Sequence, residues 1–146
     1  MTRILTACIA LVAIGAFLGM LLLRSQVVPS IRTRTTSIPV QLARTTSELK
    51  QGLSGTSSLP VGTGMLFIFE HPGGYGFWMK DMQYPLDIVW MDENLRVVEI
   101  TQHLTPETFP EVTYPQVPVK YVLELNADTA KQGGFVIGEK VKLRGY

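Results

Sequence analysis

The pattern of hydrophobic and polar positions divides the chain into three parts, and the first is the most distinct. Ile4 to Leu23 is a run of twenty residues without a charge. As a helix this run spans roughly 30 Å, which is the thickness of a bilayer core. It ends at Arg24 without the small-x-small pattern that marks a cleavage site. We therefore expect a retained transmembrane anchor over residues 1–24, with a cleaved signal peptide as the alternative.

The charges beside this run bear on its orientation. Arg3 precedes it, whereas Arg24, Arg32 and Arg34 follow it. The count of flanking basic residues favours a cytoplasmic C-terminus, but short N-terminal anchors commonly act as uncleaved export signals. We expect the second arrangement, which is a single-pass protein of the cell membrane whose C-terminal domain is extracytoplasmic.

The second part, residues 25–38, is rich in Ser, Thr and Arg and lacks sustained apolar periodicity. It predicts a tether, whose arginines could also contact anionic lipid headgroups. The third part, residues 39–146, is long enough to form one small core.

Within residues 39–146, short apolar runs alternate with turn signals. Thr45 and Glu48 have the spacing of a capping box, and Gly52 can end the helix, which predicts a helix over Thr46 to Gln51. A second helix is expected over Ala127 to Gln132, capped by Asn126. The expected strands are Met65–Phe69, Phe77–Met79, Leu86–Met91, Arg96–Gln102, Lys120–Leu125, Phe135–Ile137 and Val141–Leu143. Four prolines make residues 105–118 a long loop.

Six or seven short strands with two short helices predict an α+β, mainly β domain. We expect a small curled sheet or a partly closed barrel, preceded by the one N-terminal transmembrane helix.

Composition and charge exclude several classes of protein. Cys8 is the single cysteine, so no internal disulfide can form, and with only His71 and His103 no zinc-ligand set has the right spacing. We predict no metal and no cofactor. The formal net charge is +1, but residues 44–146 hold nine basic and twelve acidic side chains. A weakly acidic domain predicts no nucleic-acid partner.

Asp87 is the first candidate for chemistry, because it shares a strand face with the apolar Val89 and Met91. A buried carboxylate needs a partner or a shifted pKa, and Lys80 is the nearest candidate along the chain. Either Lys80 and Asp87, together with loop amides, pin the hairpin, or both face a ligand.

Aromatic residues and methionines allow two interpretations each. Trp78, Tyr84, Trp90 and Tyr75 could form a platform for a sugar ring or a peptide, or they could belong to the core. Four methionines could bind a soft metal, although adaptable core filling is the simpler account of Met65, Met79, Met82 and Met91. We name Lys80, Asp87, Trp78 and Tyr84 as tentative ligand-binding residues and assign no catalytic residue.

Glu124 lies between Leu123 and Leu125 and repeats the situation of Asp87. With Asp87 it could form the two-carboxylate pair of a glycosidase, and His103 could be a general base. The sequence carries no serine-hydrolase elbow, zinc-protease motif, phosphate-binding glycine loop or dinucleotide fingerprint.

Three segments carry a resemblance to a known family: Gly64-Met65-Leu66-Phe67, Phe77-Trp78-Met79-Lys80 and Pro85-Leu86-Asp87. With the flanking sequence from about Val40 to Leu143, they resemble the bacterial and archaeal "domain of unknown function 192" family. The resemblance implies a small β-rich domain, frequently exported or anchored, with no settled activity.

The chain also departs from this family's pattern. A helix end that bears arginines in members reads Leu49 to Gly55 here, and residues 105–118 lack the cysteine that members often carry. The turn glycine of members is replaced by Leu95, so we expect Asn94 to adopt the left-handed conformation.

Our leading hypothesis is a membrane-anchored, non-catalytic module that binds a small ligand or an envelope protein around Lys80, Asp87 and residues 105–118. The bilayer itself is a partner through residues 4–23. The alternatives are a small envelope hydrolase that uses Asp87 with Glu124 or His103, and a structural subunit of a membrane complex.

Overall fold

The structure, a computed structural model, describes residues 27–146. The predicted anchor over residues 1–24, including Cys8, lies outside the described residues. In residues 27–146, no helix has both the length and the apolar character needed to cross a membrane.

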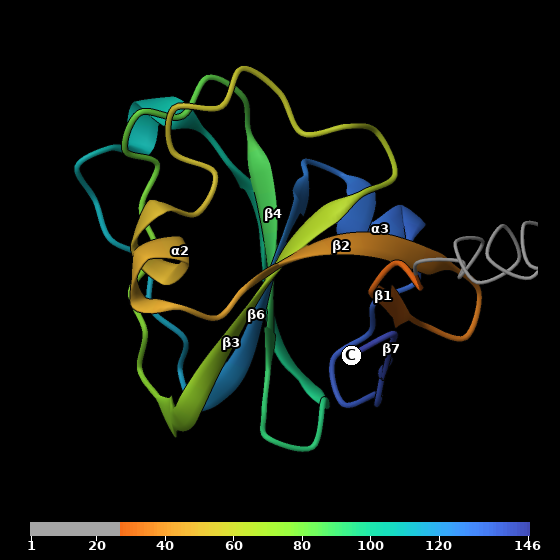
Figure 1. Cartoon of the computed structure of the whole chain (residues 1–146). Coiled ribbons are helices and arrows are strands. Elements are labelled where there is room, and N and C mark those ends of the chain that lie inside the picture. The colour runs from red at the N-terminus through yellow and green to blue at the C-terminus, as the bar shows by residue number, and fades with distance from the viewer. Residues whose placement is uncertain (1–26) are drawn as a thin grey trace, which may run out of the picture.

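Seven strands form one sheet that curls into a half-barrel, as Figure 1 shows. Their order across the sheet is β5-β4-β6-β3-β2-β1-β7, and every neighbouring pair is antiparallel except β2 with β3. The strands are β1 Ser30–Arg32, β2 Ser37–Ala43, β3 Gly64–Gly73, β4 Leu86–Met91, β5 Val97–Leu104, β6 Val119–Asn126 and β7 Lys142–Arg144. The helices are α2 Thr46–Gln51 and α3 Thr129–Gln132, with a 3-10 turn, η1, over Pro106–Thr108. The mainly β prediction with two short helices is confirmed.

The segment predicted as a tether is partly a hairpin of the sheet. Ile31 of β1 is fully buried and lies opposite Ile38 of β2, and β1 also pairs with β7. The domain therefore begins before Pro39, and residues 30–38 belong to it. The prediction was wrong there because β1 has only three residues, and only Ser37 and Ile38 of β2 fall within residues 25–38, which is too little to show a period.

Helix α2 forms as predicted. Thr45 Oγ1 accepts the Glu48 N–H, and the Glu48 carboxylate accepts the Thr45 N–H, which completes the capping box. Gly52 ends the helix at a φ of 49°, in the region that favours glycine. This local signal was strong enough to fix both ends of the helix.

Helix α3 starts later than predicted. Its N-cap is Asp128, at a φ of 67°, and Asn126 instead ends β6 and donates its side-chain N–H to the Leu59 carbonyl, 2.9 Å away. Asn126 pairs with Leu86 in the sheet, and this pairing outweighs the local preference of asparagine for a helix N-cap.

Two predicted strands and one turn residue are corrected. Phe77 forms an isolated bridge with Thr113, and residues 135–137 are not a strand. In the turn after β4, Leu95 takes the left-handed conformation at a φ of 61°. Asp92 Oδ1 accepts the N–H groups of Asn94 and Arg96 and so fixes the turn around Leu95.

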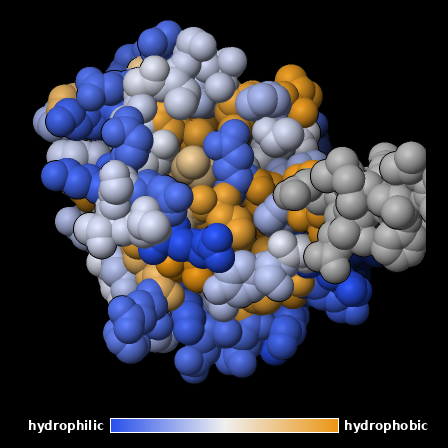
Figure 2. All heavy atoms as spheres, in the orientation of Figure 1, coloured by the Kyte–Doolittle hydropathy of each residue, from blue (hydrophilic) through white to orange (hydrophobic). Residues whose placement is uncertain are grey.

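The sheet has two buried faces, each covered by one helix, and Figure 1 places α2 and α3 on opposite sides of it. The α3 face packs Val89, Leu123 and Leu125 against Ala130. The α2 face packs Phe67, Ile88, Trp90 and Val122, with Leu49 of α2 against them. Figure 2 shows apolar side chains reaching the surface in the middle of one view, bordered by hydrophilic residues.

Candidate functional site

Asp87 lies on the α3 face and is fully buried. Its Oδ1 accepts the His103 N–H and its Oδ2 accepts the Ala130 N–H, each at 3.0 Å. The carboxylate therefore ties the end of β5 and the start of α3 to β4. Backbone amides do hold Asp87, which agrees in part with the first of the two interpretations, but they belong to β5 and α3 and not to the loop before β4.

Lys80 is not the partner of Asp87. The Lys80 side chain is exposed and its Nζ lies 5.7 Å from the centre of the Trp78 ring. Among residues 27–146, no ion pair joins Lys80 to Asp87. Met79 takes the buried position of this segment, which leaves Lys80 at the surface. The structure thus does not bring the two predicted charges together.

The four aromatic residues of the predicted platform lie in different surroundings. Trp90 is fully buried and donates its indole N–H to Thr101 Oγ1, whereas Tyr75 stacks on Phe69 at 3.5 Å between ring centres. The Tyr84 hydroxyl lies 2.6 Å from Thr56 Oγ1 and is part of the packing. Trp78 remains half exposed. A single platform of all four rings is therefore excluded.

The four methionines pack in the apolar interior or at its margin. Met79 and Met91 are buried, and Met65 and Met82 pack against buried clusters. This bears out their interpretation as core residues.

Glu124 lies on the α2 face, opposite to Asp87. On β6 it faces Ile88 of β4, whereas Asp87 faces Leu125. Because directly opposed residues share a face and neighbours along a strand do not, the two carboxyls point to opposite sides of the sheet. The glycosidase pair of Asp87 and Glu124, which the sequence left open as an alternative, is therefore not formed.

His103 is also on the Asp87 side of the molecule. Its backbone N–H binds Asp87, and its ring Nδ1 lies 3.9 Å from Asp128 Oδ1 in an exposed position. The structure thus does not place His103 beside Glu124.

Glu124 lines a cleft of about 270 Å³ between α2 and the sheet. One side of the cleft is the end of α2 and the turn after it, residues 49–54. The other walls come from β3, β6 and the segment between β3 and β4, namely Phe67, Phe69, Tyr75, Gly76, Phe77, Trp78, Met82 and Glu124. An acidic group therefore lies among aromatic rings.

The Glu124 carboxyl has an unmet hydrogen-bonding capacity. Its Oε2 is buried and has no hydrogen-bond partner in the part of the chain that the structure describes. Burial raises the pKa of Glu124 to about 8, because removal from water penalises the charged form. At neutral pH the group is mainly the uncharged acid, which both donates and accepts hydrogen bonds.

Basic and polar residues lie beside the mouth of the cleft. Lys50, at the end of α2, lines the cleft itself. Lys50 and Trp78 also line an adjoining hollow of about 250 Å³ together with Lys80. Of the residues predicted to bind a ligand, Trp78 and Lys80 are thus near the cleft, Asp87 lies on the other face, and Tyr84 is held by Thr56.

Sequence reasoning found Glu124 but gave it the wrong companions. The signal was a carboxylate between two leucines of a buried strand, which indicated burial without a direction. No local pattern pointed to Phe67 or Phe77 as cleft walls, because an apolar run looks the same whether it packs on the core or lines a cleft.

Comparisons with known proteins agree with this fold. The family described as DUF192, Uncharacterized ACR, matches residues 28–143. No curated protein matches the chain.

Two crystal structures are similar to the chain. A candidate transcription regulator of Sinorhizobium meliloti has a TM-score of 0.72 and 29% identity, over 81% of this chain and 93% of that one. A protein of unknown function from Novosphingobium aromaticivorans has a TM-score of 0.71 and 29% identity, over 80% of this chain and 84% of that one.

Proposed function

This chain belongs to the DUF192 family, and we propose that it is a membrane-anchored binding module that takes up a small ring-containing ligand in the Glu124 cleft without chemical turnover. The family has no settled activity, so the proposal depends on the geometry of the cleft. The observation that carries it is Glu124 Oε2, which is buried beside the cleft without a partner in residues 27–146.

A buried polar atom without a partner costs roughly 1–3 kcal/mol. Leucine or methionine in place of Glu124 would avoid this cost in a strand that is otherwise apolar. A ligand with a complementary polar group would remove the cost on binding. The protonated acid offers one O–H donor and one C=O acceptor, which match the C=O and N–H of an amide.

The walls of the cleft define the rest of the ligand. Trp78 is 48% exposed and lines the cleft together with the buried rings of Phe67 and Phe77, and a flat ring packs well against such aromatic walls. The volume of about 270 Å³ is just below the usual range of ligand pockets and suits a single ring. We therefore propose a one-ring molecule that carries an amide or lactam group.

The envelope-hydrolase alternative finds less support. Acid–base hydrolysis of a glycoside needs two carboxyl groups that flank one bond. Besides Glu124, the titratable side chains of the cleft lining are Lys50 and Tyr75. Asp87 and His103, the predicted companions, lie on the other side of the sheet. The binding module is thus the better supported hypothesis.

Benzamide is a suitable probe, because it combines one ring with one amide. We expect it to bind the full-length chain in detergent micelles in the millimolar range, as is usual for a fragment of this size. Trp78 fluorescence and the melting temperature would report binding. Glu124→Leu is expected to weaken binding at least tenfold, while Glu124→Gln retains a donor and an acceptor and should retain binding.

The matched control is Glu93→Gln, which changes an exposed carboxyl of a turn away from the cleft. It should leave the affinity for benzamide unchanged. Equal affinity of the wild type and Glu124→Leu, or no saturable binding by the wild type, contradicts the proposal. Release of a product from a ring-bearing ester or glycoside would favour the hydrolase instead.

Anchoring is the second part of the proposal. Its support is the uncharged run from Ile4 to Leu23, which ends six residues before β1 begins. We expect the full chain to remain in the membrane fraction after an alkaline carbonate wash and a chain without residues 1–26 to be released. In cells whose cytoplasmic membrane is intact, an added protease should digest the C-terminal domain once the envelope layers outside that membrane are made permeable. Extraction of the full chain by carbonate contradicts the anchor.

A further inference from the structure

A cluster of basic side chains lies at the edge of the sheet where β1 pairs with β7, far from the Glu124 cleft in the strand order. Arg32, Arg34, Lys140, Lys142 and Arg144 line one shallow groove of about 360 Å³ together with Thr33. We call these five residues the basic edge. They are five of the thirteen lysines and arginines of the chain, and all five are exposed.

The pairing of the strands forces these charges together. Arg32 of β1 lies directly opposite Lys142 of β7. Like charges that face each other across an antiparallel pair are destabilising. Lys142 and Arg144 are two residues apart, so both point to the same side of β7. The arrangement therefore carries an electrostatic cost that an anionic partner would relieve.

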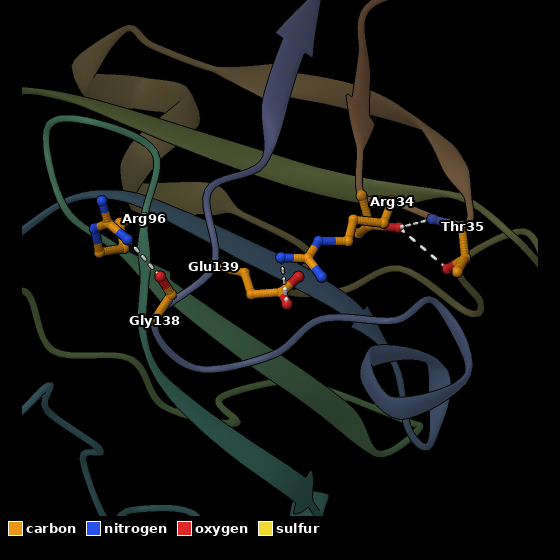
Figure 3. Close-up of polar contacts among 6 residues, drawn as sticks. Arg34, Thr35, Arg96, Gly138 and Glu139 are labelled. Atoms are coloured by element: carbon orange, nitrogen blue, oxygen red, sulfur yellow. Dashed lines mark hydrogen bonds and ion pairs between the residues drawn. The ribbon is translucent and has the colours of Figure 1, made fainter.

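Within the chain, Glu139 offsets only part of this charge. Its Oε1 lies 3.0 Å from Arg34 Nη2, and Figure 3 shows the two side chains pointing toward each other. Among residues 27–146, the other four members of the basic edge form no ion pair. The edge thus keeps a net positive charge on a domain whose remaining charge is mainly acidic.

The start of the domain fixes where this edge lies relative to the proposed anchor. Six residues, 24–29, separate Leu23 from the first residue of β1. Even fully extended, this stretch covers at most about 25 Å. With Ile4 to Leu23 in a bilayer, β1 must lie within that distance of the membrane surface, and β7 is its neighbour.

We propose that the basic edge binds anionic phospholipid headgroups and holds the domain against the membrane in which the chain is anchored. This inference rests on the anchoring part of the proposed function. Each basic residue near an anionic leaflet favours the docked state by about fivefold. Several such residues on one edge of the sheet act together, so docking also orients the rest of the domain and its cleft.

The test uses the full chain in lipid nanodiscs made of phosphatidylcholine alone or mixed with phosphatidylglycerol. A fluorophore is attached at Ser37→Cys, beside the basic edge, or at Ser58→Cys as the distant control, each in a Cys8→Ala background. Quenching by lipids with spin-labelled headgroups reports contact with the bilayer. We expect quenching at Ser37 and not at Ser58, and only in the anionic discs.

Charge reversal distinguishes binding through the basic edge from nonspecific adsorption of the domain to the bilayer. Arg32→Glu with Lys142→Glu should lower the ratio of docked to undocked domain at least tenfold, as should about 1 M salt, where the screening length is about 3 Å. The matched control is Lys120→Glu with Lys131→Glu, which reverses two lysines outside the groove and should change nothing. If the double charge reversal disrupts the pairing of β1 with β7, Lys142→Gln with Arg144→Gln makes the same test with a milder change.

The outcomes distinguish the two proposals. A chain that fails to copurify with either kind of disc overturns the anchor and, with it, this inference. A chain that enters both discs but shows equal quenching in both, or quenching that charge reversal leaves unchanged, overturns the headgroup contact alone. Binding of short duplex DNA by the basic edge, without quenching in anionic discs, overturns it in favour of a nucleic-acid partner.

Discussion

Asp87 and Glu124 are both buried carboxyls on neighbouring strands of one sheet, but their surroundings differ in kind. Asp87 receives two backbone N–H groups, from His103 and Ala130. Glu124 lies beside a cleft with one oxygen unpartnered in the described residues, and burial raises its pKa to about 8. The first carboxyl stabilises the fold, whereas the second is retained at a cost to it.

The difference follows from what covers each face. On the α3 face, two backbone segments turn their N–H groups toward Asp87. His103, at a φ of 55°, donates its own N–H, and Asp128, at a φ of 67°, precedes the donor Ala130 by two residues. On the α2 face a six-residue helix with no buried residue leaves a cleft open above Glu124. Burial alone therefore does not single out a candidate functional group, whereas burial without partners beside a cleft does make Glu124 a candidate.

Among the substitutions considered, Glu124→Gln should change the free energy of unfolding most, and the size of this change should depend on pH. Burial raises the pKa of Glu124 in the folded chain from its ordinary value of 4.5 to about 8, so the wild type loses stability as pH rises from about 4.5 to about 8 and levels off above that. The loss amounts to roughly 1.4 kcal/mol per pH unit, or about 4 kcal/mol between pH 5 and pH 8. Urea unfolding of the full chain at several pH values measures it.

The glutamine variant lacks this titration, so its stability should gain on the wild type as pH rises. If the difference in unfolding free energy between the wild type and Glu124→Gln stays constant from pH 5 to pH 8, Glu124 is ionised in the folded chain. The contrast with Asp87 would then disappear.

Asp87→Asn should cost about 3 kcal/mol of stability, because one of the two N–H groups would face an amide N–H instead of an oxygen. The same unfolding experiment at neutral pH measures the cost. Asp81→Asn, at an exposed position in the segment that precedes β4, serves as the control and should cost little. An Asp87→Asn variant as stable as the wild type would mean that the carboxylate does not hold β5 and α3.

Thr45→Ala should have the smallest effect, about 1 kcal/mol, because it removes one half of the capping box. The substitution acts on the Glu124 face alone, because α2 covers that face and not the face of Asp87. A frayed α2 admits water to the cleft, so the pKa of Glu124 should fall toward its ordinary range. The loss of stability at alkaline pH should shrink accordingly, while Thr46→Ala leaves it intact.

The two carboxyls also show which features of the candidate site could be predicted from the sequence. Their alternation with apolar neighbours predicted burial, and that was correct for both. The choice of Lys80 as the partner of Asp87 was wrong, because the nearest charge in sequence was preferred over amides 16 and 43 residues away. The Asp87–Glu124 pair was wrong because residue alternation fixes faces only after the register of β4 and β6 is known.

Local signals determined the elements that depend on short-range physics. The sequence by itself predicted α2 from its caps, β4 from its apolar run, and the mainly β class from the number of runs. Three other features depend on long-range packing: residues 30–38 join the sheet, distant amides reach Asp87, and Glu124 lines a cleft. Hydrogen-bond partners and cavity walls come from segments far apart in the chain, so their meeting depends on how the whole sheet curls.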